Sequence, residues 1–157
     1  MSKFELKIDK NVSPAKISIS GTIDEDVDFS IYSLAGLSQM ELDLNSIKSI
    51  NSCGIREWIK WLGTNSTAKM TYINCPKIIV DQINMVDGFL PKNAQVLSFY
   101  VPYYNDQSGT EKNILFKLGN EFSEKGVKPP EKVLDDAGQE MEMDVIETKY
   151  FKFLSKK

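Results

Sequence analysis

Strand-like and helix-like hydrophobic patterns alternate along the first 100 residues, and this alternation is the feature that most restricts the fold of the chain. Apolar residues occupy every second position in residues 4–8, 15–19 and 40–44, which is the spacing of strands with one buried face. Residues 70–73 and 94–101 form two further strand-like runs. Strands that alternate with helices favour an α/β fold, in which helices cover a partly parallel sheet.

Two segments between these strands have the spacing of amphipathic helices. The first starts close to Ser52 and ends at Gly63, a residue that favours a helix C-terminus. The second starts at Pro76, which the first turn of a helix tolerates, and ends at Gly88. Their expected buried stripes are Ile55, Trp58, Ile59 and Leu62 in the first helix and Ile79, Ile83 and Val86 in the second. A short helix over residues 29–34 is also expected.

The character of the sequence changes in residues 103–109, which are dense in turn-forming side chains. Alternation in residues 114–118 predicts another strand, and Lys-Pro-Pro at 128–130 interrupts the chain. We therefore expect an α/β domain over residues 1–101, followed by a small β-rich appendage and tail over residues 102–157.

The 157 residues include no histidine and only two cysteines, Cys53 and Cys75. The lack of imidazole excludes Ser-His-Asp and Cys-His catalysis, histidine bases and most catalytic zinc sites. Two cysteines so far apart also form neither a CxxC redox pair nor a four-ligand metal site. We expect neither enzymatic activity nor a bound cofactor or metal.

Charge and hydropathy narrow the class of partner. The chain carries 19 basic and 22 acidic side chains, for a net charge of -3, and such a balance provides no basic field for a nucleic-acid backbone. No apolar run approaches the roughly 20 residues that span a bilayer, and the first residues lack the apolar core of a signal peptide. We expect a cytoplasmic protein that binds another protein rather than nucleic acid or a membrane.

The most informative local sequence is Asn51-Ser52-Cys53-Gly54, at the junction between a predicted strand and a predicted helix. Backbone N–H groups at a helix N-terminus carry the positive end of the helix dipole, so they would stabilise an anionic group on Ser52. A phosphate there would also add about two negative charges to a docking face. Ser52 is therefore a candidate phosphoacceptor, although a plain helix cap accounts for the same residue types.

Three segments, at residues 21–24, 42–45 and 50–55, resemble in their order and separation the STAS domain of anti-sigma factor antagonists. The resemblance covers about residues 3–100. It implies a mixed sheet of four to five strands with helices on one main face. It also implies a partner kinase that is itself an anti-sigma factor and that phosphorylates the first serine of the loop.

The resemblance carries over to this chain residue by residue. Ser52 falls on the phosphoacceptor, Asn51 on the loop aspartate, Cys53 on the second serine and Gly54 on the glycine, while Asp24 and Asp43 fall on the acidic residues beside the loop. Asn51 removes a carboxylate and Cys53 removes a hydroxyl. Both departures put kinase recognition in doubt while leaving the fold intact.

Trp58 and Trp61 lie three positions apart in the first predicted helix. We expect one of them in the core and the other partly exposed near Ser52, where a tryptophan would suit a partner interface. The predicted partner-binding residues are thus Asp24, Asp43, Asn51, Cys53, Gly54 and Trp61.

Two turn-like sites in the appendage, Asn105-x-x-Ser108 and Leu134-x-x-Ala137-Gly138, carry a second resemblance. They are similar to the CxxC and CxxCG sites of STAS-like proteins with a zinc-ribbon tail, but none of these residues supplies a thiolate or an imidazole. The resemblance implies a ribbon that has lost its metal. A plain β-hairpin and tail, held by packing onto the larger body, fits the same residues.

The leading interpretation is a non-enzymatic signalling module that docks a protein partner through the loop and helix at Ser52, with phosphorylation of Ser52 as a switch. Two alternatives stay open. One is a constitutive scaffold or homodimerisation unit, in which the STAS-like domain is only a platform and the tail contacts a larger assembly. The other is a sensor of nucleotides or other small anions that uses the same helix N-terminus.

Overall fold

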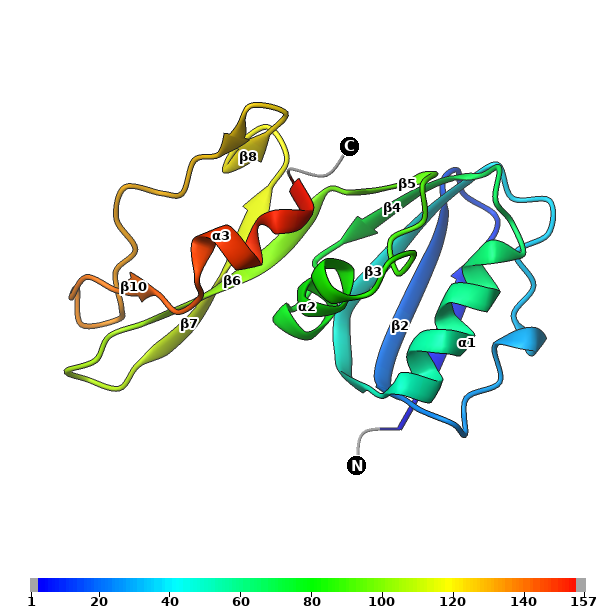
Figure 1. Cartoon of the computed structure of the whole chain (residues 1–157), viewed down its shortest axis with the longest axis horizontal. Helices are drawn as coiled ribbons and strands as arrows, with labels where there is room; N and C mark the ends of the chain where they lie inside the picture. The colour runs from blue at the N-terminus through cyan, green and yellow to red at the C-terminus, as the bar shows by residue number, and fades with distance from the viewer. Residues whose placement is uncertain (1–2, 155–157) are drawn as a thin grey trace.

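A five-stranded mixed β-sheet forms the centre of the larger part of the molecule (Figure 1). The structure is a computed structural model that describes residues 3–154. The strands follow one another across the sheet in chain order and are β1 (Glu5–Asp9), β2 (Ala15–Ile23), β3 (Gln39–Ile50), β4 (Lys69–Ile73) and β5 (Ala94–Val96). β1 and β2 are antiparallel, and the other neighbours are parallel. The predicted α/β class with a mixed sheet of four to five strands is confirmed.

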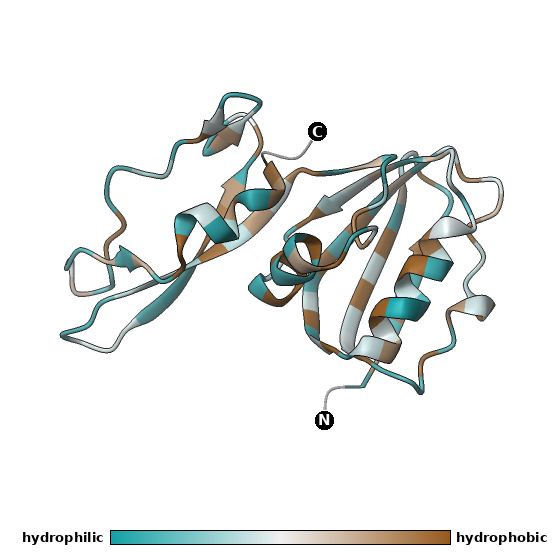
Figure 2. Ribbon diagram, in the orientation of Figure 1, coloured by the Kyte–Doolittle hydropathy of each residue, from teal (hydrophilic) through white to brown (hydrophobic). Residues whose placement is uncertain are grey.

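Both long helices lie on the same face of this sheet. α1 (Ser52–Gly63) joins β3 to β4, and α2 (Lys77–Met85) joins β4 to β5. Parallel strands are joined by right-handed crossovers, so a chain that moves across the sheet in one direction places successive helices on one face. Every second residue of β2 is buried and the residues between them are exposed or half-buried, an alternation that Figure 2 shows along the strands. On the opposite face, the described side chains of β2, β3 and β4 are exposed or half-buried.

An aromatic cluster fills the space between α1 and the sheet. Trp58 stacks on Phe89 with ring centroids 5.4 Å apart, and Trp61 stacks on Phe29 at 4.7 Å. The indole Nε1–H of Trp58 donates to the hydroxyl of Tyr72 at 3.1 Å, and that hydroxyl donates to the backbone carbonyl of Phe89 at 2.7 Å. These buried polar atoms are therefore paired with one another, as burial requires.

The predicted helix over residues 29–34 is only a single 3-10 turn, Phe29–Ile31. The Asp28 carboxylate accepts hydrogen bonds from both the backbone N–H and the hydroxyl of Ser30, which closes the turn locally. Phe29 is the buried residue of the turn, whereas Ile31 is exposed. The segment therefore lacks the continuous apolar stripe whose packing stabilises a longer helix.

The predicted strand over residues 94–101 is two strands that belong to different sheets. β5 pairs with β4, whereas β6 (Ser98–Tyr104) pairs with β7 (Glu111–Lys117). Leu97 lies at the change of sheet, since its backbone N–H still donates to β4 at 2.8 Å. The predicted boundary between residues 101 and 102 lies inside β6.

The second part of the chain is β-rich, as the sequence predicts. β6 is the central strand of a three-stranded sheet, with β7 on one side and β10 (Glu142–Met143) on the other. β8 (Phe122–Ser123) pairs with β9 (Gly126–Val127). Residues 1–2 and 155–157, which the predicted domain ranges include, lie outside the described residues. Within the described part of the chain, no helix combines the length and the hydropathy that crossing a bilayer requires.

The C-terminal segment folds back onto α2. It forms α3 (Glu147–Tyr150) and a 3-10 turn (Lys152–Leu154), in which Tyr150 and Phe153 are buried. The side chain of Asn84 in α2 joins it twice: Nδ2 donates to the carbonyl of Tyr150 and Oδ1 accepts from the N–H of Phe153, both at 2.9 Å. The Tyr150 hydroxyl also donates to a backbone carbonyl of β6 at 2.5 Å. The tail thus packs against both parts of the chain.

Candidate functional site

The side chain of Asn51 organises the junction between β3 and α1. Its Oδ1 accepts a hydrogen bond from the backbone N–H of Gly54 at 2.9 Å, which caps the helix, and its Nδ2 donates to Oε2 of Glu25 at 2.8 Å. Its backbone N–H donates to the carbonyl of Ile23 at 3.1 Å. An aspartate at this position could cap the helix but could not donate to Glu25. The amide therefore suits the acidic neighbour that this chain has.

Gly54 lies where the first turn of α1 contacts the end of β2. A Cβ added at this position would lie 2.3 Å from the backbone carbonyl oxygen of Ile23 and 2.9 Å from a carbon of the Ile23 side chain. Real Cβ atoms essentially never make contacts this short. Only glycine lets the helix start this close to the sheet, so Gly54 fixes where the neighbouring Ser52 is displayed.

Ser52 is the first residue of α1 and is exposed. Cys53 is half-buried, and the guanidinium of Arg56 lies 3.8 Å from its Sγ. Because α1 is 12 residues long, the N–H groups of its first turn carry a developed positive end of the helix dipole. The hydroxyl of Ser52 is thus placed at the end of the helix that favours an anion.

An acidic loop follows β2 and borders this junction. Its acidic side chains are Asp24, Glu25, Asp26 and Asp28. Asp24 accepts a hydrogen bond from the backbone N–H of Asp26 at 3.0 Å and so shapes the turn. Glu25 makes the direct contact with Asn51, and that hydrogen bond lowers the pKa of its carboxyl. Sequence reasoning missed Glu25; the signal that could have found it is an amide at position 51 beside an acidic loop.

Asp43 lies apart from Ser52. In the register of β2 and β3, Asp43 pairs with Ser18, whereas the end of β3 pairs with Ile23. Those five residues of β2 correspond to about 16 Å along the strand. The carboxylate of Asp43 instead accepts a hydrogen bond from the side-chain amide of Asn74 at 3.2 Å. Of the two aspartates expected beside the loop, the structure brings only Asp24 to it.

Trp61 is buried, which corrects the expectation that one tryptophan of α1 is exposed. Its exposed fraction is 4%, and that of Trp58 is 0%. The indole Nε1–H of Trp61 donates to the backbone carbonyl of Tyr32 at 2.7 Å, and its ring stacks on Phe29. The segment between β2 and β3 therefore covers the tryptophan. Trp61 packs under this segment, on the side of the core, and does not reach the surface that a partner would contact.

The two turns of the appendage that resemble metal-binding sites contact each other through hydrogen bonds. Asn105 and Asp135 are both buried. The side-chain amide of Asn105 donates to the carbonyl of Glu140 at 2.9 Å, and the Ser108 hydroxyl donates to Asp135 at 3.4 Å. Across residues 3–154, no group of three or more His, Cys, Asp or Glu side chains could hold a metal ion.

We expect replacement of Asp135 by alanine to lower the free energy of unfolding by about 1 to 3 kcal/mol. Its Oδ1 accepts from the backbone N–H groups of Ala137 and Gln139, both at 2.9 Å, and these donors would lose their partner. The exposed neighbour Asp136 provides the control, since Asp136→Ala should change stability by less than about 0.5 kcal/mol. Urea denaturation measures both values, and equal midpoints for the two variants would contradict the assigned role of Asp135.

Comparison with known proteins finds no relative of this chain. No family model matches it, and neither a curated protein nor a solved structure gives a significant match. What the chain does is therefore inferred from its own sequence motifs and from their geometry.

Proposed function

We propose that this chain is a STAS-like protein-interaction module of a signalling pathway, which docks a protein partner through the loop and helix at Ser52. In this proposal, phosphorylation of Ser52 releases the partner. The observation that carries the proposal is the exposed Ser52 at the first position of a 12-residue helix. The side-chain amide of Asn51 caps this helix just before Ser52, and Gly54 just after it packs closely against Ile23.

The rigidity of the junction supports a docking role. Asn51 is held by hydrogen bonds to Glu25, Ile23 and Gly54, and these bonds tie the start of α1 to the acidic loop and to the end of β2. A surface that is already ordered loses little conformational entropy when a partner binds. The loop at Ser52 can therefore present the same shape before and after docking.

The class of partner follows from the resemblance to anti-sigma factor antagonists. The five-stranded mixed sheet and the placement of α1 and α2 on one face agree with what that resemblance implies for the fold. We propose a protein partner of the kinase or anti-sigma factor class. Asn51 in place of an aspartate implies a kinase that recognises the ionised Glu25 held against the Asn51 amide.

The effect of a phosphate would fall on the partner more than on the fold. Phosphorylation adds about -1.5 to -2 charge at neutral pH, beside the ionised Glu25. The helix dipole would stabilise that charge by only about 0.3 to 1 kcal/mol. A partner that packs against a neutral hydroxyl would have to bury the new charge without an opposite charge, and this cost is larger.

Partner capture from the native host tests this proposal. Mass spectrometry of the purified protein should find phosphate on Ser52. Ser52→Ala should retain the partner, and Ser52→Asp should capture about tenfold less of it, as burying an unpaired charge at an interface predicts.

Ser66→Asp is the matched control. Ser66 is exposed just beyond the other end of α1, so this variant changes the charge equally and away from the junction. Its partner capture should equal that of the unmodified protein. Equal capture by Ser52→Ala and Ser52→Asp, with Ser52 unmodified in the host, would rule out the switch. If Arg56→Glu on the exposed face of α1 also had no effect, docking at this surface would be refuted.

The structure also decides which variants can separate a switch from a constitutive scaffold. Deletion of residues 103–157 would cut β6 and remove the buried Tyr150 and Phe153. Such a deletion would expose the core, so loss of binding would say nothing specific about the tail. The point variants at Ser52 leave the core intact, and a constitutive scaffold would bind its partner equally in both.

A further inference from the structure

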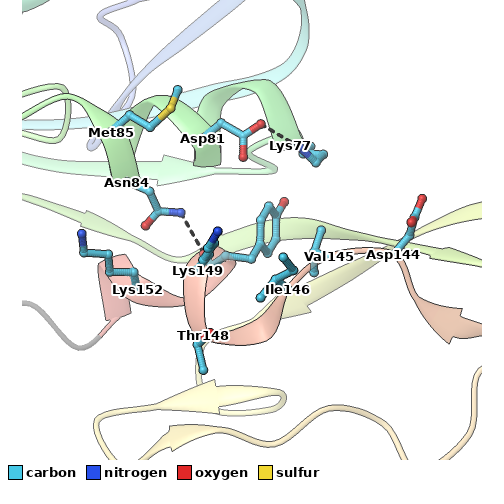
Figure 3. Close-up of a pocket in the computed structure, with 11 residues that line it drawn as sticks. Lys77, Asp81, Asn84, Met85, Asp144, Val145, Ile146, Thr148, Lys149 and Lys152 are labelled. Carbon is cyan, nitrogen blue, oxygen red and sulfur yellow. Dashed lines mark hydrogen bonds and ion pairs between the residues drawn. The ribbon is translucent and has the colours of Figure 1, made fainter.

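A groove of about 610 Å³ lies between α2 and α3 (Figure 3), and its lining includes no residue of the Ser52 junction. Met85, at the end of α2, and Ile146, just before α3, contribute one apolar side chain to each wall. Their exposed fractions are 70% and 62%. Val145 and Tyr150 extend the apolar lining. The volume lies within the range of protein binding pockets, and two large apolar side chains in it face water.

The groove is formed before any ligand binds, because its two walls are fastened to each other. Asn84 in α2 donates to the carbonyl of Tyr150 and accepts from the N–H of Phe153, both at 2.9 Å. In Figure 3 the Asn84 side chain points from α2 to the backbone of α3. Preformed walls lower the conformational cost of binding.

Charge is distributed unevenly along the groove. Lys149 lies toward one end of the lining and Asp144 lies at the other (Figure 3). On the α2 wall, Lys77 and Asp81 form an ion pair at 2.8 Å and neutralise each other. No carboxylate of residues 3–154 lies within ion-pair distance of Lys149. One end of an apolar groove therefore presents positive charge.

We propose that this groove binds an amphipathic α-helix of a protein partner, whose apolar side chains, one turn apart, contact Met85 and Ile146 and whose acidic side chains face Lys149. An open groove between two helices can accommodate an α-helix along its length, and binding of an amphipathic helix in an apolar groove is a recurring mode of peptide recognition. The N-terminus of the bound helix points toward Asp144, because the positive end of its dipole is favoured there. This second interaction surface is independent of the proposed role of Ser52.

Two synthetic helical peptides of equal length test the proposal. Both carry leucines at i, i+4 and i+7 on one face; one carries glutamates on its flanks and the other carries lysines. The acidic peptide should shift the NMR methyl signals of Met85 and Ile146 and should bind at least about tenfold more tightly than the basic peptide, measured by fluorescence anisotropy.

Exposed residues provide variants that leave the core intact. Met85→Asp and Ile146→Asp should each weaken binding of the acidic peptide by about tenfold or more. Ile31→Asp, at an equally exposed apolar residue outside the groove, should leave the affinity unchanged. Lys149→Glu should remove the preference for the acidic peptide, which a purely apolar contact would retain.

Three outcomes would overturn the proposal. The first is equal affinity for the acidic and basic peptides. The second is binding that Met85→Asp and Ile31→Asp weaken equally. The third is a shift of the Met85 and Ile146 NMR signals by decanoate, a small amphiphilic acid, when the acidic peptide causes no shift. Matching thermal unfolding curves of all variants exclude loss of fold as the cause of lost binding.

Discussion

Replacing Gly54 with alanine is expected to destabilise the protein by about 3 kcal/mol or more, because overpacking against rigid backbone is the severe form of a small-to-large change. The added methyl group would lie 2.3 Å from the carbonyl oxygen of Ile23. A flexible side chain could move aside, but this oxygen already accepts a hydrogen bond from Asn51 and belongs to the end of β2. The start of α1 would have to move away from the sheet.

Gly63→Ala in the same helix is the matched control for this prediction. A Cβ at Gly63 would meet no atom within 4 Å. Alanine has the higher helix propensity, so this variant should gain about 0.5 to 1 kcal/mol. Chemical denaturation of both variants measures the contrast. If the two substitutions changed stability by the same amount, helix propensity rather than close packing would explain Gly54.

Tyr72→Phe is expected to cost about 2 to 4 kcal/mol, although it removes a single oxygen atom. Tyr72 is fully buried, and burial raises the pKa of its hydroxyl well above the usual value, so the group stays neutral. It accepts from the indole of Trp58 and donates to the carbonyl of Phe89. Phenylalanine would leave both of these buried groups unpaired, and each carries a desolvation cost.

Tyr32→Phe tests whether the cost in Tyr72→Phe comes from the hydrogen bonds. Tyr32 is half-buried, its ring contacts Phe4, and the structure shows no hydrogen bond from its hydroxyl within residues 3–154. Its replacement should change stability by less than about 0.5 kcal/mol. Thermal denaturation followed by circular dichroism compares the two variants, and a Tyr72→Phe protein as stable as Tyr32→Phe would disprove the network's contribution.

The parts of the fold that sequence reasoning located are those set by nearby residues. The alternation in residues 15–19 and 40–44 predicts β2 and β3 because the period of two depends only on which face is buried. The helix from Ser52 to Gly63 has the expected limits because its N-terminal cap is formed within the first turn, by Asn51 and Gly54. Local hydrogen bonds of this kind are visible in sequence spacing.

The parts that sequence reasoning could not locate depend on partners far along the chain. Residues 94–101 have one continuous strand pattern, but β5 pairs with β4 while β6 pairs with β7, and only the tertiary arrangement decides this division. The burial of Trp61 depends on a carbonyl 29 residues earlier in the chain. The contact of Asn51 with Glu25 spans 26 residues. Such separations leave no local periodicity to read.

The double hydrogen bond of Asn84 to the tail has a consequence for synthesis of the chain. It joins positions 66 and 69 residues apart, and Phe153 packs on the buried Phe99 of the second sheet with ring centroids 5.2 Å apart. This aromatic core stays uncovered until Phe153 has left the ribosome. The residues of the larger sheet are synthesised well before Phe153, so this sheet can form earlier in translation than the core of the second sheet. Chains that stop before Phe153 would therefore expose aromatic side chains that favour aggregation.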